Sequence, residues 1–330
     1  MQRTFDVEAV RDQFPALGRT YHGHRVVYFD GPGGSQVARQ AIDAVSGYME
    51  RGGANLHGVF PTSTETEEIL ADTRMTAADF LGAAPDEVAF GLASNAVGTV
   101  NEVATVAEKA HTKGAIVAVD AVHAAPHIPV DRDAIGADII TCSAYKFFGP
   151  HVGVTAIRRD LFEKMGVYRL DPAPDYIPDK LETGTQNHEG IAGVKGAIDF
   201  IASLGDGASE REKLVSAMQT IEEYEAEMAA KFRAALRDLP GVKLYAASHD
   251  VRKTPTIAFR VENHAPEEVC ARMLEHGFFI AAGHFYASTL AEKLGISESD
   301  GFVRAGLAPY NTQEEVERFI EALEEFVKGR

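Results

Sequence analysis

The sequence predicts a two-domain α/β protein, with a large domain built on a mainly parallel sheet and a small α+β domain at the C-terminal end. Between Asp86 and Arg158, short β-branched segments alternate with helical ones, which is typical of a parallel sheet flanked by helices. A long helical segment, Glu210–Asp238, then introduces a second region of mixed strands and helices. The length of 330 residues agrees with two domains, because single hydrophobic cores stop growing at about 250 to 300 residues.

The strands of the large domain are predicted where apolar runs end in small or polar residues. These runs read EVAFGLAS, AIVAVDAV, DIITCSA and VGVTAIR. Between the first two, Val103, Val106 and Ala107 recur at helical spacing before the stop at Gly114. We therefore predict a crossover helix over Asn101–Lys113 and count about four strands, fewer than the usual five or six.

The small domain is predicted to begin with the helix Glu210–Asp238, which ends at the breaker pair Pro240 and Gly241. Strands VKLYA, TPTIAFRV, FFIAA and FVRAGLA follow, with a helix PEEVCARMLEHG and a terminal helix over Thr312–Lys328. We expect residues 1–30 to be an N-terminal segment that packs with the small domain, residues 31–204 to form the large domain, and residues 205–330 to form the small one.

Composition excludes several classes of partner. Asp and Glu outnumber Lys and Arg by 49 to 32, a net charge of -17 that repels nucleic acid and anionic membranes. No apolar run approaches the roughly 20 residues that span a bilayer, and the N-terminus lacks a signal-peptide core. We expect a cytoplasmic protein with Cys142 and Cys270 both reduced and buried.

Two further motifs have simpler structural explanations. The segment GPGG at Gly31 to Gly34 lacks the pattern of a phosphate loop and indicates a tight turn. The spacing of the histidines matches no compact metal-ligand motif, so no metal site is predicted. The histidines considered are His22, His24, His123, His127 and His151.

Polar groups follow three predicted strands at their carboxyl ends, where open α/β sheets bind ligands. They are Asn95, Asp120 and Lys146, and the lysine is flanked by small and aromatic residues. Chemistry with pyridoxal 5'-phosphate (PLP) needs a lysine for a Schiff base and a carboxylate that keeps the pyridine nitrogen protonated. Individually, a strand-end Asp is more often a cap and an aromatic-flanked Lys more often snorkels. Asp120 and Lys146 are therefore interpreted together with the sequence motifs around them.

That context resembles the class V aminotransferases, particularly their cysteine-desulfurase-like branch. The resemblance is carried, in order along the chain, by SNAVGTVNEV, VAVDAVHAAPH, CSAYKFFGPHVGV, ETGTQNHEGIAG and VRAGLAPYNT. It implies a three-layer, fold-type I PLP-transferase large domain, a PLP cofactor, an α-amino acid substrate and a homodimer.

By the same resemblance, Lys146 would form the Schiff base, Asp120 would pair with the pyridine nitrogen and His123 would lie beside the phenolic oxygen. Ser143 and Tyr145 match the phosphate-contacting segment. Two further positions complete the implied cofactor site: Asn95 near the ring, and Thr185, which would reach the phosphate of the neighbouring subunit.

The implied substrate site consists of an arginine and a histidine. Arg304 matches the residue that binds the substrate carboxylate, a task suited to a planar guanidinium fork. A surface ion pair is the alternative interpretation of Arg304. His57, in GANLHG, resembles an active-site histidine of the N-terminal loop.

The sequence departs from the family pattern in two places. Tyr286 or a neighbour stands where desulfurases carry their sulfur-accepting cysteine, so persulfide chemistry is not expected. After Gly91 a stretch that normally supplies a phosphate-binding helix N-terminus is missing, so the sheet should be shortened. We expect a PLP-dependent transferase or lyase, with elimination, transamination and racemisation all open. The alternative is a degenerate PLP fold that acts as a dimeric interaction protein.

Overall fold

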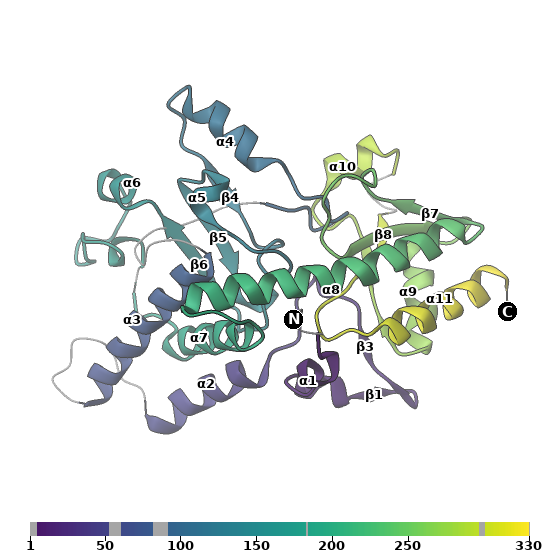
Figure 1. The fold of residues 1–330 in the computed structure, drawn as a ribbon, viewed down its shortest axis with the longest axis horizontal. Helices are drawn as coiled ribbons and strands as arrows, with labels where there is room; N and C mark the ends of the chain where they lie inside the picture. Colours follow the sequence, from purple (N-terminus) through teal and green to yellow (C-terminus); the bar gives the residue numbers. More distant parts are fainter. Residues whose placement is uncertain (1–4, 53–60, 82–91, 183, 297–300, 330) are drawn as a thin grey trace. The chain divides into compact units, whose positions relative to one another are not determined.

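The computed structural model describes residues 5–52, 61–81, 92–182, 184–296 and 301–329. The chain divides into two compact units, and Figure 1 shows its course. Unit 1 contains residues 1–36, 93–101 and 220–330, and unit 2 contains residues 37–92 and 102–219. The last transition lies inside helix α8 (Glu210–Asp238), and the short segment 93–101 belongs to unit 1. The sequence predicts a boundary at residue 204. It predicts neither a boundary inside α8 nor the membership of residues 93–101 in unit 1.

Unit 2 is built on a three-stranded sheet in the order β4-β5-β6. β4 and β5 run parallel, whereas β6 is antiparallel to β5. The bounds are β4 (Ala118–Asp120), β5 (Ile139–Ser143) and β6 (Gly153–Ile157). Three predicted strands are thus confirmed in shorter form.

The first predicted strand has a different outcome. Its residues 87–91 lie outside the described part of the chain. Its end is not a strand, because Ala93 forms only an isolated bridge to Val100 within unit 1. The part of the sheet that is described therefore lacks a partner strand on the outer side of β4.

The helices of unit 2 lie on both sides of the sheet in Figure 1, with α4 and α5 on one side and α2 and α7 on the other. α7 packs closely against α2, because a Cβ on Gly196 would lie 2.5 Å from the carbonyl oxygen of Gln40. The predicted crossover helix is confirmed as α4, two residues shorter at each end. The bounds are α2 (Arg39–Arg51), α3 (Pro61–Leu81), α4 (Val103–His111), α5 (Arg132–Ile135), α6 (Arg159–Lys164) and α7 (His188–Ser203).

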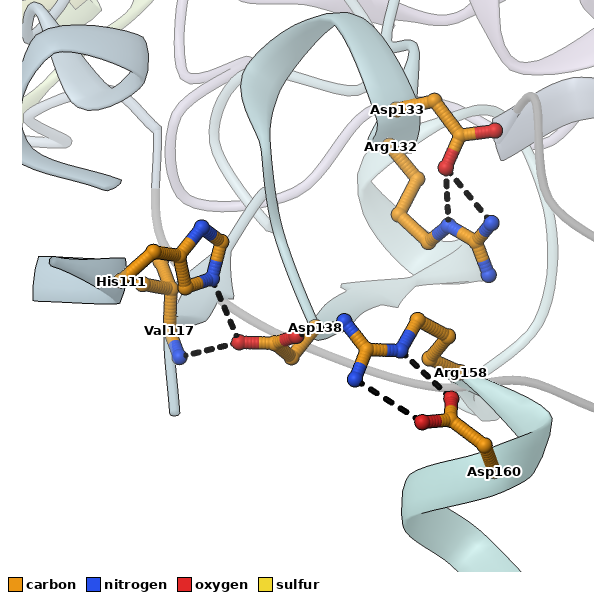
Figure 2. A network of polar contacts seen from close by, with 7 residues as sticks. All are labelled: His111, Val117, Arg132, Asp133, Asp138, Arg158 and Asp160. Atoms are coloured by element: carbon orange, nitrogen blue, oxygen red, sulfur yellow. Dashed lines mark hydrogen bonds and ion pairs between the residues drawn. The ribbon is translucent and has the colours of Figure 1, made fainter. Parts of the chain in front are cut away.

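Asp138, just before β5, links the elements at the amino end of the sheet (Figure 2). Its buried carboxylate accepts hydrogen bonds from the Val117 N–H at 2.7 Å, from His111 Nε2 at 2.9 Å and from Arg158 Nη1 at 2.6 Å. Burial alone would raise the pKa of Asp138, but these bonds and the charges of Arg158 and His111 outweigh it and lower the pKa. One carboxylate thereby joins the end of α4, the start of β4 and the end of β6.

Unit 1 contains a four-stranded antiparallel sheet in the order β10-β11-β8-β7. The strands and helices predicted for the small domain are confirmed, except that FFIAA divides into the short strands β9 and β10. The bounds are β7 (Val242–Tyr245), β8 (Thr256–Val261), β9 (Phe278–Phe279), β10 (Ala281–Gly283), β11 (Phe302–Gly306), α9 (Pro266–Glu275), α10 (Ser288–Lys293) and α11 (Gln313–Val327).

Helix α11 shows how the sequence specifies an element of this unit. Thr312 caps its first turn in a capping box with Glu315, so backbone N–H groups at the helix start are satisfied. Its buried face contributes Val316, Phe319 and Leu323 to an aromatic-rich core that also contains Phe29, Phe232, Phe259 and Phe278.

The N-terminal segment contacts the C-terminal part of unit 1. β3 (Val27–Tyr28) pairs in parallel with β9, and Arg11 at the end of α1 (Val7–Arg11) donates to Glu315 at 2.8 Å. The hairpin strands β1 (Thr20–Tyr21) and β2 (His24–Arg25) precede β3. None of the helices in the described ranges combines the length and apolar character that crossing a membrane requires.

Candidate active site

Lys146 lies in a single 3₁₀ turn (Ala144–Lys146) that directly follows β5. Its side chain is buried, with only 9% of the residue exposed, and Nζ lies 4.8 Å from the centre of the Tyr145 ring. Because Lys146 follows the C-terminal end of β5, it lies at the carboxyl edge of the sheet, where open α/β sheets bind ligands.

Asp120 is the last residue of β4 and lies opposite Thr141 of β5. The two strands are neighbours and parallel, so Asp120 and the residues after Ser143 end at the same edge of the sheet. The Asp120 carboxylate is exposed and accepts the Val122 N–H at 2.7 Å. It therefore serves as the cap of a turn and also keeps acceptor capacity toward solvent.

His123 follows in the turn after β4 and is buried, with its ring 5.4 Å from that of His127. Tyr145 stacks in parallel on His151, with ring centres 4.7 Å apart. His151 is thereby part of the surroundings of Lys146, a role that its spacing in the sequence does not reveal. Two adjacent parallel strands thus end in Asp120 and Ser143, and the turns that follow them carry His123, Tyr145 and Lys146.

Thr185 also belongs to unit 2, in the segment that precedes α7. It is exposed and lines a cavity of about 410 Å³ with Leu170, Pro172, Glu182 and His188. His57 lies outside the described residues, so its predicted role stays a prediction.

Arg304 and Asn95 both belong to unit 1 and contact each other. Arg304 Nη1 donates to the Asn95 carbonyl at 3.1 Å, and Nη2 donates to the Asp30 carboxylate at 3.1 Å. The guanidinium also lies 3.6 Å from the centre of the Phe285 ring. Burial lowers the pKa of Arg304, and the Asp30 charge opposes that shift. Arg304 does form the ion pair that the alternative interpretation expects, with Asp30, but the arginine is not at the surface, because only 5% of its side chain is exposed.

The side chains around Lys146 fit a PLP cofactor, and the side chains around Arg304 fit the carboxylate of an amino acid substrate. Unit 2 offers a buried amine and, at the same sheet edge, a carboxylate and an imidazole, which is the donor set that a PLP ring uses. Unit 1 offers Arg304, whose buried Nε has no hydrogen-bond partner within the described residues. A buried donor left in this way is suited to a carboxylate ligand.

The thiols are poorly placed for catalysis. Cys142 is fully buried in β5, where burial first and the Asp120 charge second raise its pKa. Cys270 in α9 is only partly buried, which corrects the expectation that both thiols are buried, and burial raises its pKa to about 12. Tyr286, which the resemblance places at or next to the position of the sulfur-accepting cysteine, is 98% exposed.

Comparisons with known proteins agree with one another. The sequence model of the family described as aminotransferase class-V matches residues 85–319. The chain is 26% identical to a cysteine desulfurase of Enterobacter sp. (strain 638), covering 97% of this chain and 98% of that protein. It is 30% identical to a probable cysteine desulfurase of Halalkalibacterium halodurans, over 70% of this chain and 55% of that protein.

Solved structures show the same fold. The apo cysteine desulfurase of Thermococcus onnurineus NA1 superposes with a TM-score of 0.87 at 23% identity, covering 100% of both chains. A cysteine desulfurase from Escherichia coli superposes with a TM-score of 0.81 at 19% identity, covering 99% of both chains.

Proposed function

The chain belongs to the class-V aminotransferase family, and we propose that Lys146 is the residue through which this PLP-dependent enzyme holds its cofactor. The enzyme acts on an α-amino acid. The observation that carries the proposal is the position of Lys146, a buried amine directly after β5, beside a parallel strand that ends in Asp120. When bound, PLP withdraws electrons from the α-carbon of an amino acid.

The side chains around this position would divide the work between them. The Asp120 carboxylate would hold a proton on the pyridine nitrogen, and the His123 imidazole would lie at the phenolic oxygen. Lys146 Nζ would accept and return the proton of the substrate α-carbon. Arg304, through its unpartnered Nε edge, would bind the substrate carboxylate.

For the reaction itself we propose transferase or lyase chemistry that needs no protein thiol. Its relatives are named cysteine desulfurases, but the resemblance places Tyr286 or a neighbour, and no cysteine, where desulfurases carry their sulfur-accepting cysteine. The raised pKa values of Cys142 and Cys270 leave both thiols protonated at neutral pH. The substrate amino acid is therefore converted without a persulfide on this chain.

Covalent labelling tests the role of Lys146. The purified protein is incubated with PLP, reduced with borohydride to fix the cofactor on its lysine, and mapped by peptide mass spectrometry. Label on Lys146, together with loss of the cofactor absorbance band in Lys146→Ala, is the expected result.

Lys180 is the matched internal control for this experiment. It is buried as Lys146 is, and its Nζ also lies 4.8 Å from an aromatic ring centre, that of Phe162. Lys180 Nζ donates to backbone carbonyls, including that of Met165 at 3.2 Å, and Lys180 does not follow a strand that neighbours β4. Label distributed equally over Lys146 and Lys180, or an unchanged band in Lys146→Ala, would refute a specific cofactor lysine.

A further inference from the structure

The Arg304 guanidinium is fixed by three separate contacts. Asp30 accepts from Nη2 at 3.1 Å, the Asn95 carbonyl accepts from Nη1 at 3.1 Å, and the Phe285 ring covers the guanidinium plane at 3.6 Å. Phe285 is held in place in turn, since its carbonyl accepts a hydrogen bond from Asn95 Nδ2 at 3.1 Å. The direction in which the fork points is therefore determined by its neighbours.

Asp30 is the only one of these contacts that carries charge, and the turn Gly31–Gly34 holds it in place. The N–H groups of Gly33 and Gly34 donate to the Asp30 carbonyl at 2.9 and 3.1 Å. A Cβ on Gly33 would lie 2.3 Å from Asp30 Oδ2, so only glycine leaves room for this carboxylate. The GPGG segment therefore fixes the Asp30 backbone and, at Gly33, leaves space for the Asp30 carboxylate.

The same turn is packed onto strand β11, which carries Arg304. Asp30 forms a parallel bridge to Gly306, whose N–H donates to the Phe29 carbonyl at 2.7 Å. A Cβ on Gly306 would lie 2.1 Å from Pro32 Cδ, so the two backbones are in direct contact. Carboxylate and guanidinium are thus held by one rigid junction of turn and strand.

Arg304 and Asp30 differ in burial, and this difference indicates the role of Asp30. The Arg304 side chain is 5% exposed and that of Asp30 is 43% exposed. A buried charge needs a partner, yet Asp30 binds through one oxygen, and Arg304 Nε is buried with no hydrogen-bond partner among the described residues. Asp30 therefore engages Nη2 and leaves the hydrogen-bonding capacity of Nε unused within the described residues.

We propose that Asp30 is a positioning residue, which orients the Arg304 fork so that its Nε edge meets the substrate carboxylate. The proposal rests on the function assigned to Arg304 above. Asp30 does not touch the substrate, and its essential property is an oxygen that accepts from Nη2. An asparagine supplies such an oxygen, whereas an alanine does not.

Equilibrium binding of a simple carboxylate tests this role in the intact, PLP-loaded protein. The probe is propionate, which has no amine, and its uncharged control is propionamide; both are measured by ligand-observed NMR. Because a hydrogen bond to a charged group is lost, Asp30→Ala should weaken propionate binding about tenfold or more. Asp30→Asn should stay within about threefold of the wild type, and propionamide binding should not change.

Two further variants make the test decisive. Asp30→Leu, which has similar volume and no acceptor, should repeat the loss and replaces Asp30→Ala if that variant does not fold. Asp43→Ala is the matched control, because Asp43 pairs with Arg39 on an exposed helix face and should leave propionate binding unchanged.

The contrary outcomes are distinct. Unchanged propionate binding in Asp30→Ala and Asp30→Leu would reduce Asp30 to a structural role, and tighter binding would make it a competitor of the substrate; either result overturns the proposal. A wild type that does not prefer propionate to propionamide also overturns it, while label on Lys146 would still support the cofactor assignment. Absence of that label would count against the proposed function itself.

Discussion

Cys142 and Cys270 are the two cysteines of the chain, and burial suppresses the nucleophilicity of both. The thiolate is the reactive form of cysteine, and a raised pKa leaves little of it at neutral pH. Burial raises the pKa of Cys142 in the core of β5, and that of Cys270 to about 12 in α9. The exposed position at residue 286 carries a tyrosine, whose phenol does not replace a thiol in sulfur transfer.

This chemistry predicts the behaviour of cysteine variants. With L-cysteine as a trial substrate, Cys142→Ala and Cys270→Ala should each retain turnover within about twofold of the wild type, because neither thiolate is populated. Product formation gives the rate, and intact-protein mass spectrometry reports any persulfide. A mass increase of one sulfur that disappears in either variant would contradict the assignment.

At the level of elements, Asp138 connects a helix and two strands far from the residues assigned to catalysis. Its carboxylate is buried, whereas Asp160, which binds the same arginine at 2.5 Å, is exposed. Exposed ion pairs contribute little to stability, while a buried carboxylate with several donors contributes more. In the network of Figure 2, Arg158 therefore binds two carboxylates, of which Asp138 is buried and Asp160 is exposed.

We expect Asp138→Asn to lower the free energy of unfolding by about 2 kcal/mol at neutral pH, and Asp160→Asn to leave it nearly unchanged. The folded-state pKa of Asp138 lies below its ordinary value of 3.8, so its stabilisation is present above that pH and is lost as pH falls through the lower folded value.

The difference between wild type and Asp138→Asn should therefore shrink in urea unfolding at about pH 3 relative to pH 7. Asp160→Asn serves as the control under the same conditions. An equal loss of stability in the two variants, or a difference that grows in acid, would show that the buried network is not the cause.

The whole molecule is shorter than its relatives, which raises the question of how it holds the cofactor phosphate. The alignment with the Enterobacter protein runs over 415 positions, although this chain has 330 residues, so the relative contains segments that this chain lacks. The resemblance places Thr185 at the phosphate of a neighbouring subunit. We propose a homodimer in which each subunit completes the cofactor site of the other.

Mixed dimers test this arrangement. Lys146→Ala should bind no cofactor covalently, and Thr185→Val should bind PLP about tenfold more weakly, because one hydrogen bond to a charged phosphate is lost. Co-expression with two different tags yields the mixed dimer, in which one site combines intact Lys146 with intact Thr185 of the partner subunit. PLP titration followed by absorbance should show half of the sites with wild-type affinity.

The Thr185→Val homodimer is the reference for that measurement. If the mixed dimer has the same weakened affinity as this reference, Thr185 acts within its own subunit. A single-subunit mass in sedimentation experiments would likewise contradict the shared site.

Most of the local structure and the type of chemistry could be predicted from the amino-acid sequence. The periodicity of apolar residues and the capping signals specify α8 and α11 to within a residue, because these forces act between near neighbours. The strand pattern also places Asp120 and Lys146 after adjacent parallel strands, as the structure has them.

Contacts between residues that are distant in the sequence could not be predicted and became visible in the folded protein. Asp30 and Arg304 are 274 positions apart, and GPGG indicates a turn without indicating what it holds. The pairing of residues 93–101 within unit 1, the stacking of Tyr145 on His151 and the exposure of Asp120 were equally beyond the sequence. The physical reason is that local propensity acts over a few residues, whereas burial and ion pairing depend on which surfaces the completed fold brings into contact.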